Sequence, residues 1–338
     1  MKISPKLLTS LLLATLSFGA SATTTSKADS PDETAASLKS EFLQTQLALG
    51  FTEQEVKSFL GKAKFDQGVI DAMTKPWEAK PWHQYYPIFL TEKRLNAGLE
   101  FWKKHESTVN RAAKEFEVDP QIIIAIIGIE TFYGGYMGKY PVVDALYTLG
   151  FYYPPRATFF RKELSNLQTL VKDEKLDLDN LNGSYAGAMG YGQFIPSSYR
   201  HYAVDFDNDG QRDLLNNPVD AVGSVANYFH QHGWVAKAPV AIPLSGPTEL
   251  PSNLKVWEGE RLHYQVSDIL SPTLALSEPV DLDISQPAML VELKQEKDSD
   301  YWLGLNNFYV ITRYNRSPLY AMAVYQFSQE LKKAHDAS

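Results

Sequence analysis

Hydrophobic residues recur with helical spacing along roughly the first two thirds of the chain. Helix-start signals interrupt this pattern at intervals. Thr52 followed by Glu55 is a capping box, and Thr91 is the expected N-cap of a helix that runs through Trp102. The pattern therefore predicts one mainly helical region over residues 36–234.

The most hydrophobic stretch in this region is 122–129, which fits either a buried strand or a buried helix. Asp119 followed by Pro120 is a helix-start signal, and Gly134–Gly135 is a stop signal. The two signals are separated by about 14 residues, a length that favours a helix over a strand.

The pattern changes after Trp234, where prolines become frequent and apolar runs become short, as at 288–293. We interpret 235–300 as a small β-rich insertion. Residues 301–338 are expected to return to the helical core, first as an aromatic strand or turn and then as a helix from about Leu319.

The N-terminal segment reads as an export signal. Two lysines precede the apolar run 7–18, and Ala20-Ser21-Ala22 is a small-residue cleavage site. We expect residues 1–22 to be removed as a signal peptide and 23–35, rich in Ser, Thr, Asp and Ala, to be a flexible lead-in. The mature protein would then be soluble in the periplasm.

The charge and the cysteine count exclude several classes of function. The formal net charge is −8, which argues against nucleic acid or an anionic membrane surface as the main partner. The chain has no cysteine, which excludes a lipid-modified N-terminal cysteine, a zinc-thiolate site and a cysteine nucleophile. No membrane anchor is expected.

Glu130 is the most informative single residue. It follows the isoleucine-rich run, and Ile126 and Ile127 stand one turn before it on the predicted helix. Desolvation and the helix C-terminus both favour a protonated carboxyl near neutral pH, which is what a leaving group in glycosidic cleavage requires. Taken alone, the residue also fits a surface glutamate at a frayed helix end.

Two further segments combine flexible backbone with aromatic or amide side chains. The segment 183–196 carries four glycines beside aromatics, which suits close approach of a ligand or, equally, a tight structural turn. The segment 311–315, followed by Tyr320, suits a sugar with N-acetyl groups or a tyrosine-rich core edge.

These segments, taken in order, resemble the B-type lytic transglycosylases of glycoside hydrolase family 103. The similarity extends from about Pro81 to Tyr325, and several separate motifs carry it. They are 126–131, 137–139, 144–146, 185–196 with its GAMGYGQF core, 223–229 and 312–315.

The resemblance implies an α+β fold that is mainly α, with a lysozyme-like helical core, a helical subdomain and a small β-rich subdomain. It also implies cleavage of the MurNAc-GlcNAc β-1,4 bond of peptidoglycan with formation of 1,6-anhydro ends. The substrate would be peptidoglycan glycan strands, and complexes of cell-wall synthesis or remodelling are the protein partners that such an activity suggests.

The resemblance also assigns roles to individual residues. Glu130 matches the single catalytic acid of the family, while Ser184 and Gln193 match polar groups beside it. Further positions match residues that contact or lie near the sugar: Tyr85, Arg156, Tyr228, Asn315 and Tyr320.

The segment 205–211 fits the first seven positions of a calcium-binding loop. Acids stand at the first, third and fifth positions, glycine at the sixth, and a backbone carbonyl would serve at the seventh. The twelfth position is Asn216, so Asp220 is the expected last acid, as in the variant loop of the resembling family. The expected ligands of this structural calcium ion are Asp205, Asp207, Asp209, Gln211 and Asp220. An Asx-turn cluster without metal is the alternative.

Two other functions fit parts of the sequence. A hydrolase of the same glycan would need a second carboxylate, for which Asp144 and Glu163 are the unsupported candidates. A peptidoglycan-binding scaffold without activity would be expected to lack the acid, yet Glu130 is present.

Overall fold

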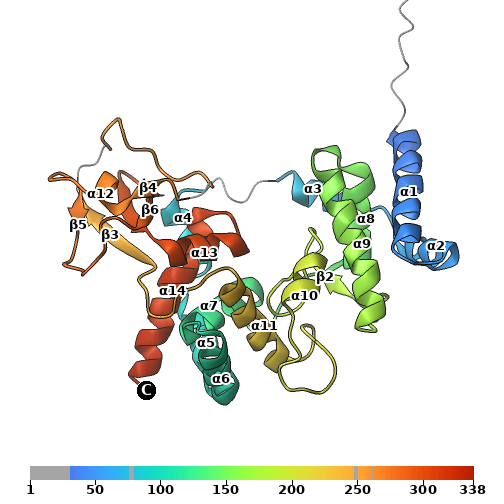
Figure 1. Cartoon of the computed structure of the whole chain (residues 1–338), viewed down its shortest axis with the longest axis horizontal. Helices are drawn as coiled ribbons and strands as arrows, with labels where there is room; N and C mark the ends of the chain where they lie inside the picture. Colours follow the sequence, from blue (N-terminus) through green and yellow to red (C-terminus); the bar gives the residue numbers. More distant parts are fainter. Residues whose placement is uncertain (1–30, 76–79, 247–249, 260–261) are drawn as a thin grey trace, which may run out of the picture.

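A computed structural model describes residues 31–75, 80–246, 250–259 and 262–338 of the chain. The described residues form a mainly helical molecule with a small antiparallel sheet, so the fold class expected from the sequence is confirmed (Figure 1). None of the helices in the described ranges combines the length and apolar character that a membrane crossing requires.

A central group of helices surrounds α7. Because a helix that is apolar on every side must be covered on every side, α5, α6, α11 and α14 all pack against α7. Its isoleucines 122–124, 126 and 127 are essentially without solvent contact. The group consists of α5 (Glu92–Lys104), α6 (Glu106–Phe116), α7 (Pro120–Thr131), α11 (Pro218–Gln231) and α14 (Pro318–Asp336).

A second helical group lies to one side of this centre, on the right in Figure 1. Its main contact is between α8 and α9, and α1 packs on both. The group contains α1 (Pro31–Ala48), α2 (Glu53–Lys62), α3 (Gln67–Met73), α8 (Val142–Tyr152), η2 (Pro154–Arg156) and α9 (Ala157–Asp173). The short pair β1 (Tyr140–Pro141) and β2 (Asn182–Gly183) and the helix α10 (Pro196–Tyr202) join it to the centre.

The sheet lies on the opposite side and has the strand order β4-β6-β7-β3-β5, with all neighbours antiparallel. The hairpin of β6 and β7 pairs Met289 with Gly304 at one end and Lys294 with Ser299 at the other. A small separate core lies beneath the sheet. The elements are β3 (Ala241–Ser245), β4 (Tyr264–Gln265), α12 (Val266–Ile269), β5 (Ala275–Leu276), β6 (Pro287–Lys294) and β7 (Ser299–Gly304).

Short helices connect the sheet to the central group. The helix α4 (Trp82–Tyr85) contacts β6 and continues into η1 (Tyr86–Ile88), while α13 (Asn306–Tyr314) contacts both β7 and α14. In Figure 1, α13 and α10 stand on opposite sides of the space above α11.

Several local predictions are confirmed. Thr52 and Glu55 form a complete capping box at the start of α2. The hydroxyl of Thr91 caps α5 by accepting from the Arg94 amide, and the helix continues two residues past Trp102. The apolar run is helical in α7, as its length indicated.

Other local predictions differ from the structure. Asp119 precedes α7 without capping it, because its carboxylate instead accepts from the Trp234 indole at 2.9 Å and the Lys237 amide at 3.2 Å. The segment 311–315, expected as part of a strand or turn, belongs mostly to α13. The last residues of the expected lead-in 23–35 are the start of α1; the rest of it and the signal peptide 1–22 lie outside the described residues.

Candidate active site

Glu130 is the second-last residue of α7 and lies at the edge of the central core. Its side chain is partly exposed, while Ile126, Ile127 and Ile129 around it are buried. The Tyr320 hydroxyl donates a hydrogen bond to Oε1 of Glu130 at 2.5 Å. Burial raises the pKa of the Glu130 carboxyl from its ordinary 4.5 to about 7, and the Tyr320 hydrogen bond works in the opposite direction. The carboxyl is therefore poised to give and take a proton near neutral pH.

The end of α7 is held in an unusual backbone conformation. Phe132 and Tyr133 both have positive φ angles, 53° and 60°. The Tyr133 ring fills the space beside two glycines: a Cβ on Gly98 or Gly128 would come within 2.3 Å or 2.4 Å of its hydroxyl oxygen. The ring also stacks on Phe101 with centroids 5.3 Å apart. Tight packing thus fixes the turn directly after the acid.

Thr131 connects this turn to the glycine-rich segment. Its hydroxyl donates to the Tyr191 carbonyl at 2.9 Å and accepts from the Gly134 amide at 3.0 Å. Tyr314 makes a second connection, since its hydroxyl donates to the Gly192 carbonyl at 2.5 Å. Because Thr131 directly follows Glu130, the bonds to Tyr191 and Gly192 bring Tyr314 to the same end of α7. Burial raises the Tyr314 pKa, and the charge of Glu130 raises it further.

The glycine-rich segment itself is a tightly bonded turn. Ser184 Oγ accepts from the amides of Ala186 and Ala188, at 3.2 Å and 3.1 Å. Gln193 has a φ of 51°, and its Nε2 donates to the carbonyls of Met137 and Gly190. These bonds are those of a structural turn, and they also fix Gln193 close to Tyr314 on the wall of a cavity.

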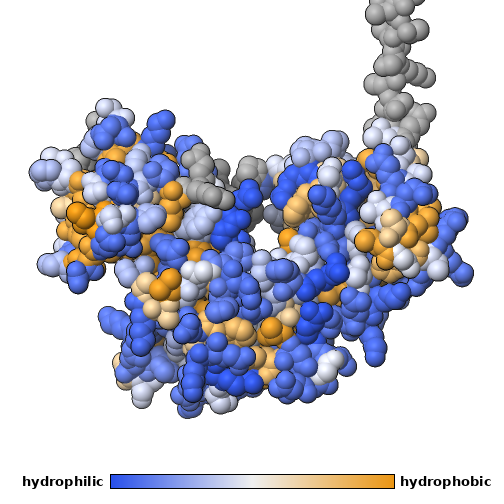
Figure 2. Space-filling view, in the orientation of Figure 1, coloured by the Kyte–Doolittle hydropathy of each residue, from blue (hydrophilic) through white to orange (hydrophobic). Residues whose placement is uncertain are grey.

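That cavity, of about 150 Å³, brings together residues from three distant segments: Gln193, Phe194, Ile195, Ser198, Tyr228, Arg313 and Tyr314. The Tyr228 hydroxyl donates to the Arg313 carbonyl at 2.6 Å, and its ring stacks on His232 with centroids 4.1 Å apart. Figure 2 shows that the molecular surface is hollowed between the sheet and the helices α8 and α9, with mostly hydrophilic residues on both sides.

The other sugar-site candidates are placed as follows. Tyr85 is buried in α4 and packs against Phe89, with ring centroids 5.2 Å apart. Asn315 ends α13 and accepts from the Ser317 amide at 3.0 Å. Arg156 is exposed in the second helical group, where its guanidinium lies 4.5 Å from the Phe159 ring centroid.

Tyr314 and Arg313 line the cavity of about 150 Å³, and the sequence did not single them out as candidates. Both stand inside the segment 312–315 that carried part of the resemblance, so their motif was visible. Their roles were not, because the hydroxyl of Tyr314 meets Gly192, which is 122 positions away in the sequence.

The two candidate second carboxylates are engaged elsewhere. Asp144 Oδ1 accepts from the Lys64 amide at 2.7 Å. Glu163 is buried, and its Oε2 accepts from the Ser197 amide at 2.9 Å. Both lie in the helical group of α8 and α9, and their hydrogen bonds are to that group and to α10.

The predicted calcium loop gathers oxygen ligands. Carboxylate oxygens of Asp205, Asp207 and Asp209 lie within 4.8 Å of one another, a donor set that suits a hard cation. Asp220 reaches the loop from α11, where its two oxygens accept from the amides of Phe206 at 2.7 Å and Asp213 at 2.8 Å. Burial raises the pKa of Asp220, and the charges of Asp207 and Asp205 raise it further.

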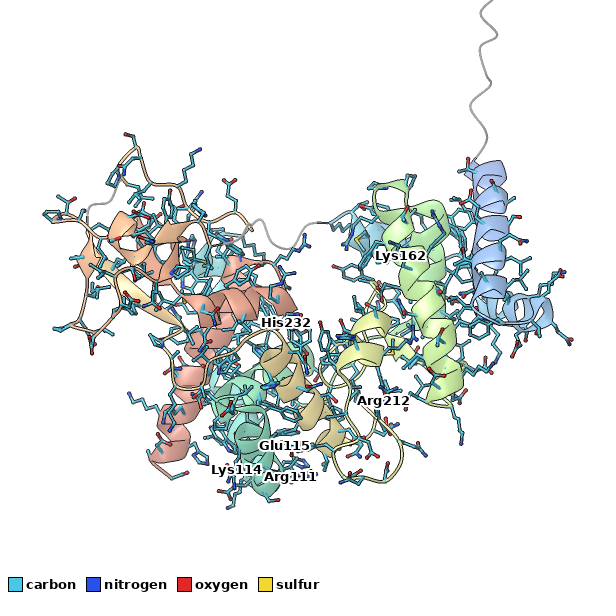
Figure 3. All side chains as sticks on the ribbon, viewed as in Figure 1. Arg111, Lys114, Glu115, Lys162, Arg212 and His232 are labelled. Carbon is cyan, nitrogen blue, oxygen red and sulfur yellow. The ribbon has the colours of Figure 1, made fainter. Side chains whose placement is uncertain are left out.

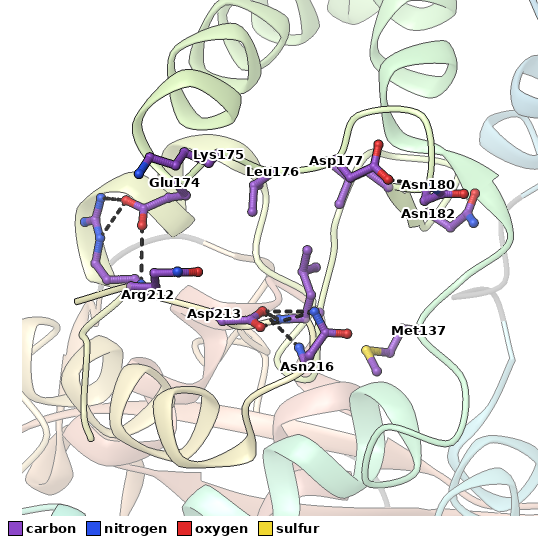
Figure 4. A pocket seen from close by; sticks show the side chains of 14 residues that line it. Met137, Glu174, Lys175, Leu176, Asp177, Asn180, Asn182, Arg212, Asp213 and Asn216 are labelled. Carbon is purple, nitrogen blue, oxygen red and sulfur yellow. Dashed lines mark hydrogen bonds and ion pairs between the residues drawn. The ribbon is translucent and has the colours of Figure 1, made fainter. Parts of the chain in front are cut away.

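Figure 4 shows a separate cavity of about 360 Å³ between the end of α9 and this loop. An ion pair between Glu174 and Arg212 closes one side, and Asp213 accepts from Asn216 on the other. Of the predicted site residues, only Gln211 lines it. Most of its lining comes from 174–182 and 211–216, and Glu130 is not part of it.

Comparison with known proteins gives a consistent answer. The family model described as the transglycosylase SLT domain matches residues 34–329. The membrane-bound lytic murein transglycosylase B of Escherichia coli is 43% identical over 296 residues, which cover 84% of this chain and 80% of that protein.

Two solved structures share the fold at high similarity. The Escherichia coli lytic transglycosylase Slt35 in complex with calcium has a TM-score of 0.80 and 41% identity, covering 88% of this chain and 94% of that one. SltB3 from Pseudomonas aeruginosa in complex with NAG-anhNAM-pentapeptide has a TM-score of 0.75 and 28% identity, covering 89% and 80%.

Proposed function

The chain belongs to the transglycosylase SLT domain family and is a peptidoglycan-cleaving lytic transglycosylase, and on that premise we propose that Glu130 is its single catalytic acid and base. One observation carries the proposal: Glu130 is a carboxyl at the edge of the core whose pKa burial raises to about 7. Such a group is protonated in much of the population at neutral pH and can also act as a base.

In the first step, protonated Glu130 gives its proton to the oxygen that bridges MurNAc and GlcNAc, and the bond from the muramyl anomeric carbon to that oxygen breaks. In the second step, the Glu130 carboxylate takes the proton of the muramyl C6 hydroxyl, and the C6 oxygen bonds to the anomeric carbon. The products are a free GlcNAc hydroxyl and a 1,6-anhydro-MurNAc end. Because the substrate supplies the nucleophile, the reaction needs no second protein carboxylate.

The surroundings of the acid favour this route over hydrolysis. A glycosidase that uses water or a covalent intermediate places two carboxyls about 5 to 9.5 Å apart. Asp144 and Glu163 are held by backbone amides in another helical group. The neighbours that the structure gives Glu130 are tyrosines and isoleucines.

Tyr320 has a second role in the proposal besides the sugar contact that the resemblance implies. Its hydroxyl proton is directed at Glu130, so it orients the carboxyl and stabilises its ionised form. We assign Tyr320 as a positioning residue for both steps, since an ionised Glu130 must exist between them.

The remaining substrate contacts are Tyr85, Arg156, Ser184, Gln193, Tyr228 and Asn315. The common cavity of Gln193 and Tyr228 beside Tyr314 supports the assignment of those two. For Ser184 and Asn315, local hydrogen bonds support a role in shaping the wall, which would orient the N-acetyl groups of the substrate.

A structural calcium ion bound by Asp205, Asp207, Asp209, the Gln211 carbonyl and Asp220 is a further part of the proposal. The grouped carboxylates support it, because three close acids repel one another unless a cation joins them. A related structure, that of Slt35, was obtained in complex with calcium. The ion would stabilise the loop between α10 and α11 and takes no part in the two chemical steps.

Export to the periplasm follows from the proposed function, because peptidoglycan lies outside the cytoplasmic membrane. The signal segment 1–22 and the absence of cysteine support a mature protein without a lipid anchor.

We also propose that 36–234, 235–300 and 301–338 are the functional divisions of the chain, the first and last building the site around Glu130. Complexes of cell-wall synthesis or remodelling are the proposed protein partners.

Digestion of purified peptidoglycan with the wild-type protein and with Glu130→Gln tests the chemistry. Wild-type products should carry anhydro ends and be about 18 mass units lighter than hydrolytic products, because no water is added. Glu130→Gln keeps the shape and removes the transferable proton, so turnover should fall about 10²- to 10⁴-fold. Reducible ends from the wild type, or full activity of the variant, would contradict the proposal.

A further inference from the structure

Two cavities adjoin each other between the glycine-rich segment, α10 and α13, and both are lined by Ser198. The smaller one is lined by Tyr314. The Tyr314 hydroxyl donates to the Gly192 carbonyl, and the preceding carbonyl, that of Tyr191, accepts from Thr131, the residue after Glu130. The larger one, of about 560 Å³, extends over α10 to Asn166. Tyr202 on the larger and Tyr228 on the smaller are in ring contact with centroids 4.7 Å apart. Because they share Ser198, we treat the two linings as one groove and call it the basic groove.

The charge of the basic groove is opposite to that of the chain. The protein has 40 acidic and 32 basic residues, yet no aspartate or glutamate lines either cavity. Arg313, Arg200 and His201 are the ionisable groups besides tyrosine. Glu163 accepts from the amide of Ser197, which lines the larger cavity, but the Glu163 side chain is itself buried.

Neither arginine has a carboxylate partner among the residues that the structure describes. Arg313 is exposed, with its guanidinium 5.7 Å from the Tyr309 ring centroid. Arg200 donates to the neutral Asn166 Oδ1 at 2.6 Å. His232, which Figure 3 labels at the end of α11, contacts Tyr202 from the larger cavity and Tyr228 from the smaller one. Two arginines in an acid-free groove favour an anionic ligand, because a guanidinium offers five donors and no acceptor.

Given the proposed function, the ligand can be identified by its charge. The sugars of the glycan strand carry no charge when their peptides are joined by amide bonds. Binding of the sugars therefore does not explain why acidic residues are absent from the groove. The stem peptides carry free carboxylates. A stem peptide is attached to the muramyl residue whose glycosidic bond is cleaved beside Glu130. We propose that the basic groove binds carboxylates of the stem peptide, and that Arg313 and Arg200 make the enzyme prefer peptide-bearing strands.

The test compares two soluble glycan strands of equal length that carry stem peptides with acetylated amines. In the first strand the carboxyls of the stem peptides are free, and in the second they are capped as methylamides. Binding of both strands is measured in a Glu130→Gln background, and cleavage in a wild-type background. Arg313→Gln and Arg200→Gln should each weaken binding of the uncapped strand about three- to tenfold more than that of the capped strand. High salt should reduce the preference of the parent protein for the uncapped strand.

Lys114→Gln, an equal change of charge on α6, is the control and should leave the ratio of the two affinities unaltered. Melting temperatures check that each arginine variant is folded. Equal losses on both strands would mean that the groove holds glycan, and no loss on either would mean that it holds nothing; both results overturn the inference. Because binding is measured without turnover, a failure of the anhydro-product assay would count against the proposed function alone.

Discussion

Replacing Glu130 with glutamine should stabilise the protein at alkaline pH and have little effect at acidic pH. In the folded protein, burial raises the pKa of this carboxyl from 4.5 to about 7. In the unfolded chain the carboxyl ionises near its ordinary value. Between these two pH values the unfolded state loses a proton that the folded state keeps, so the free energy of unfolding falls as pH rises.

The magnitude follows from the two pKa values. The difference between 4.5 and about 7, at about 1.4 kcal/mol for each pKa unit, gives about 3.5 kcal/mol. Contact of the partly exposed side chain with solvent lowers this, so we expect about 2 to 3 kcal/mol. Glutamine has the same shape and can still accept from Tyr320, but it carries no charge to desolvate.

Urea unfolding of the wild type and of Glu130→Gln at pH 4 and pH 8 measures this effect. The gain from the substitution at pH 8 should exceed the gain at pH 4 by about 2 to 3 kcal/mol. Glu41→Gln, at an exposed position on α1, serves as the control and should show little difference between the two pH values. The reasoning is refuted if the gain from Glu130→Gln is the same at both pH values, or if the variant is the less stable protein at pH 8.

Three further predictions concern the neighbours of the acid and the calcium loop. Tyr320→Phe removes a hydrogen bond that lowers the Glu130 pKa, so the alkaline limb of the pH–activity profile should move to higher pH by about one unit. An alkaline limb that stays in place or moves to lower pH would contradict the assigned role. Gly128→Ala places a Cβ within 2.4 Å of the Tyr133 hydroxyl, so the free energy of unfolding measured in urea should fall by about 1 to 3 kcal/mol. The control, Gly61→Ala on α2, has open space around the new Cβ and should be neutral or slightly stabilising. The melting temperature should be higher in millimolar calcium than in chelator, and Asp207→Asn should reduce this difference. At a calcium concentration a hundredfold above Kd, binding adds about 2.7 kcal/mol to the free energy of unfolding. Equal melting curves with and without calcium would contradict a stabilising role for the ion.

Local features of this protein could be predicted from the sequence because they depend on neighbours in the chain. The capping box of Thr52 and Glu55 spans one helical turn and forms as expected. The isoleucine run before Glu130 already indicated an apolar environment and a raised pKa, both of which the structure has. Ordered motifs likewise carried the resemblance to the family that the comparisons show.

The tertiary structure decided what depends on residues far apart. Tyr320 reaches Glu130 from 190 positions away, so its hydrogen bond to the acid had no local signal in the sequence. Asp119 has the sequence of a helix cap, but the indole of Trp234, 115 positions later, competes for the same carboxylate. Arg313 and Arg200 come from different helices, α13 and α10, and they line adjoining cavities only because folding brings these helices together. Helices depend on residues that are close in the sequence, so the sequence pattern predicts them. The groups around an active site come from distant segments that meet only when the chain folds, so they depend on tertiary packing.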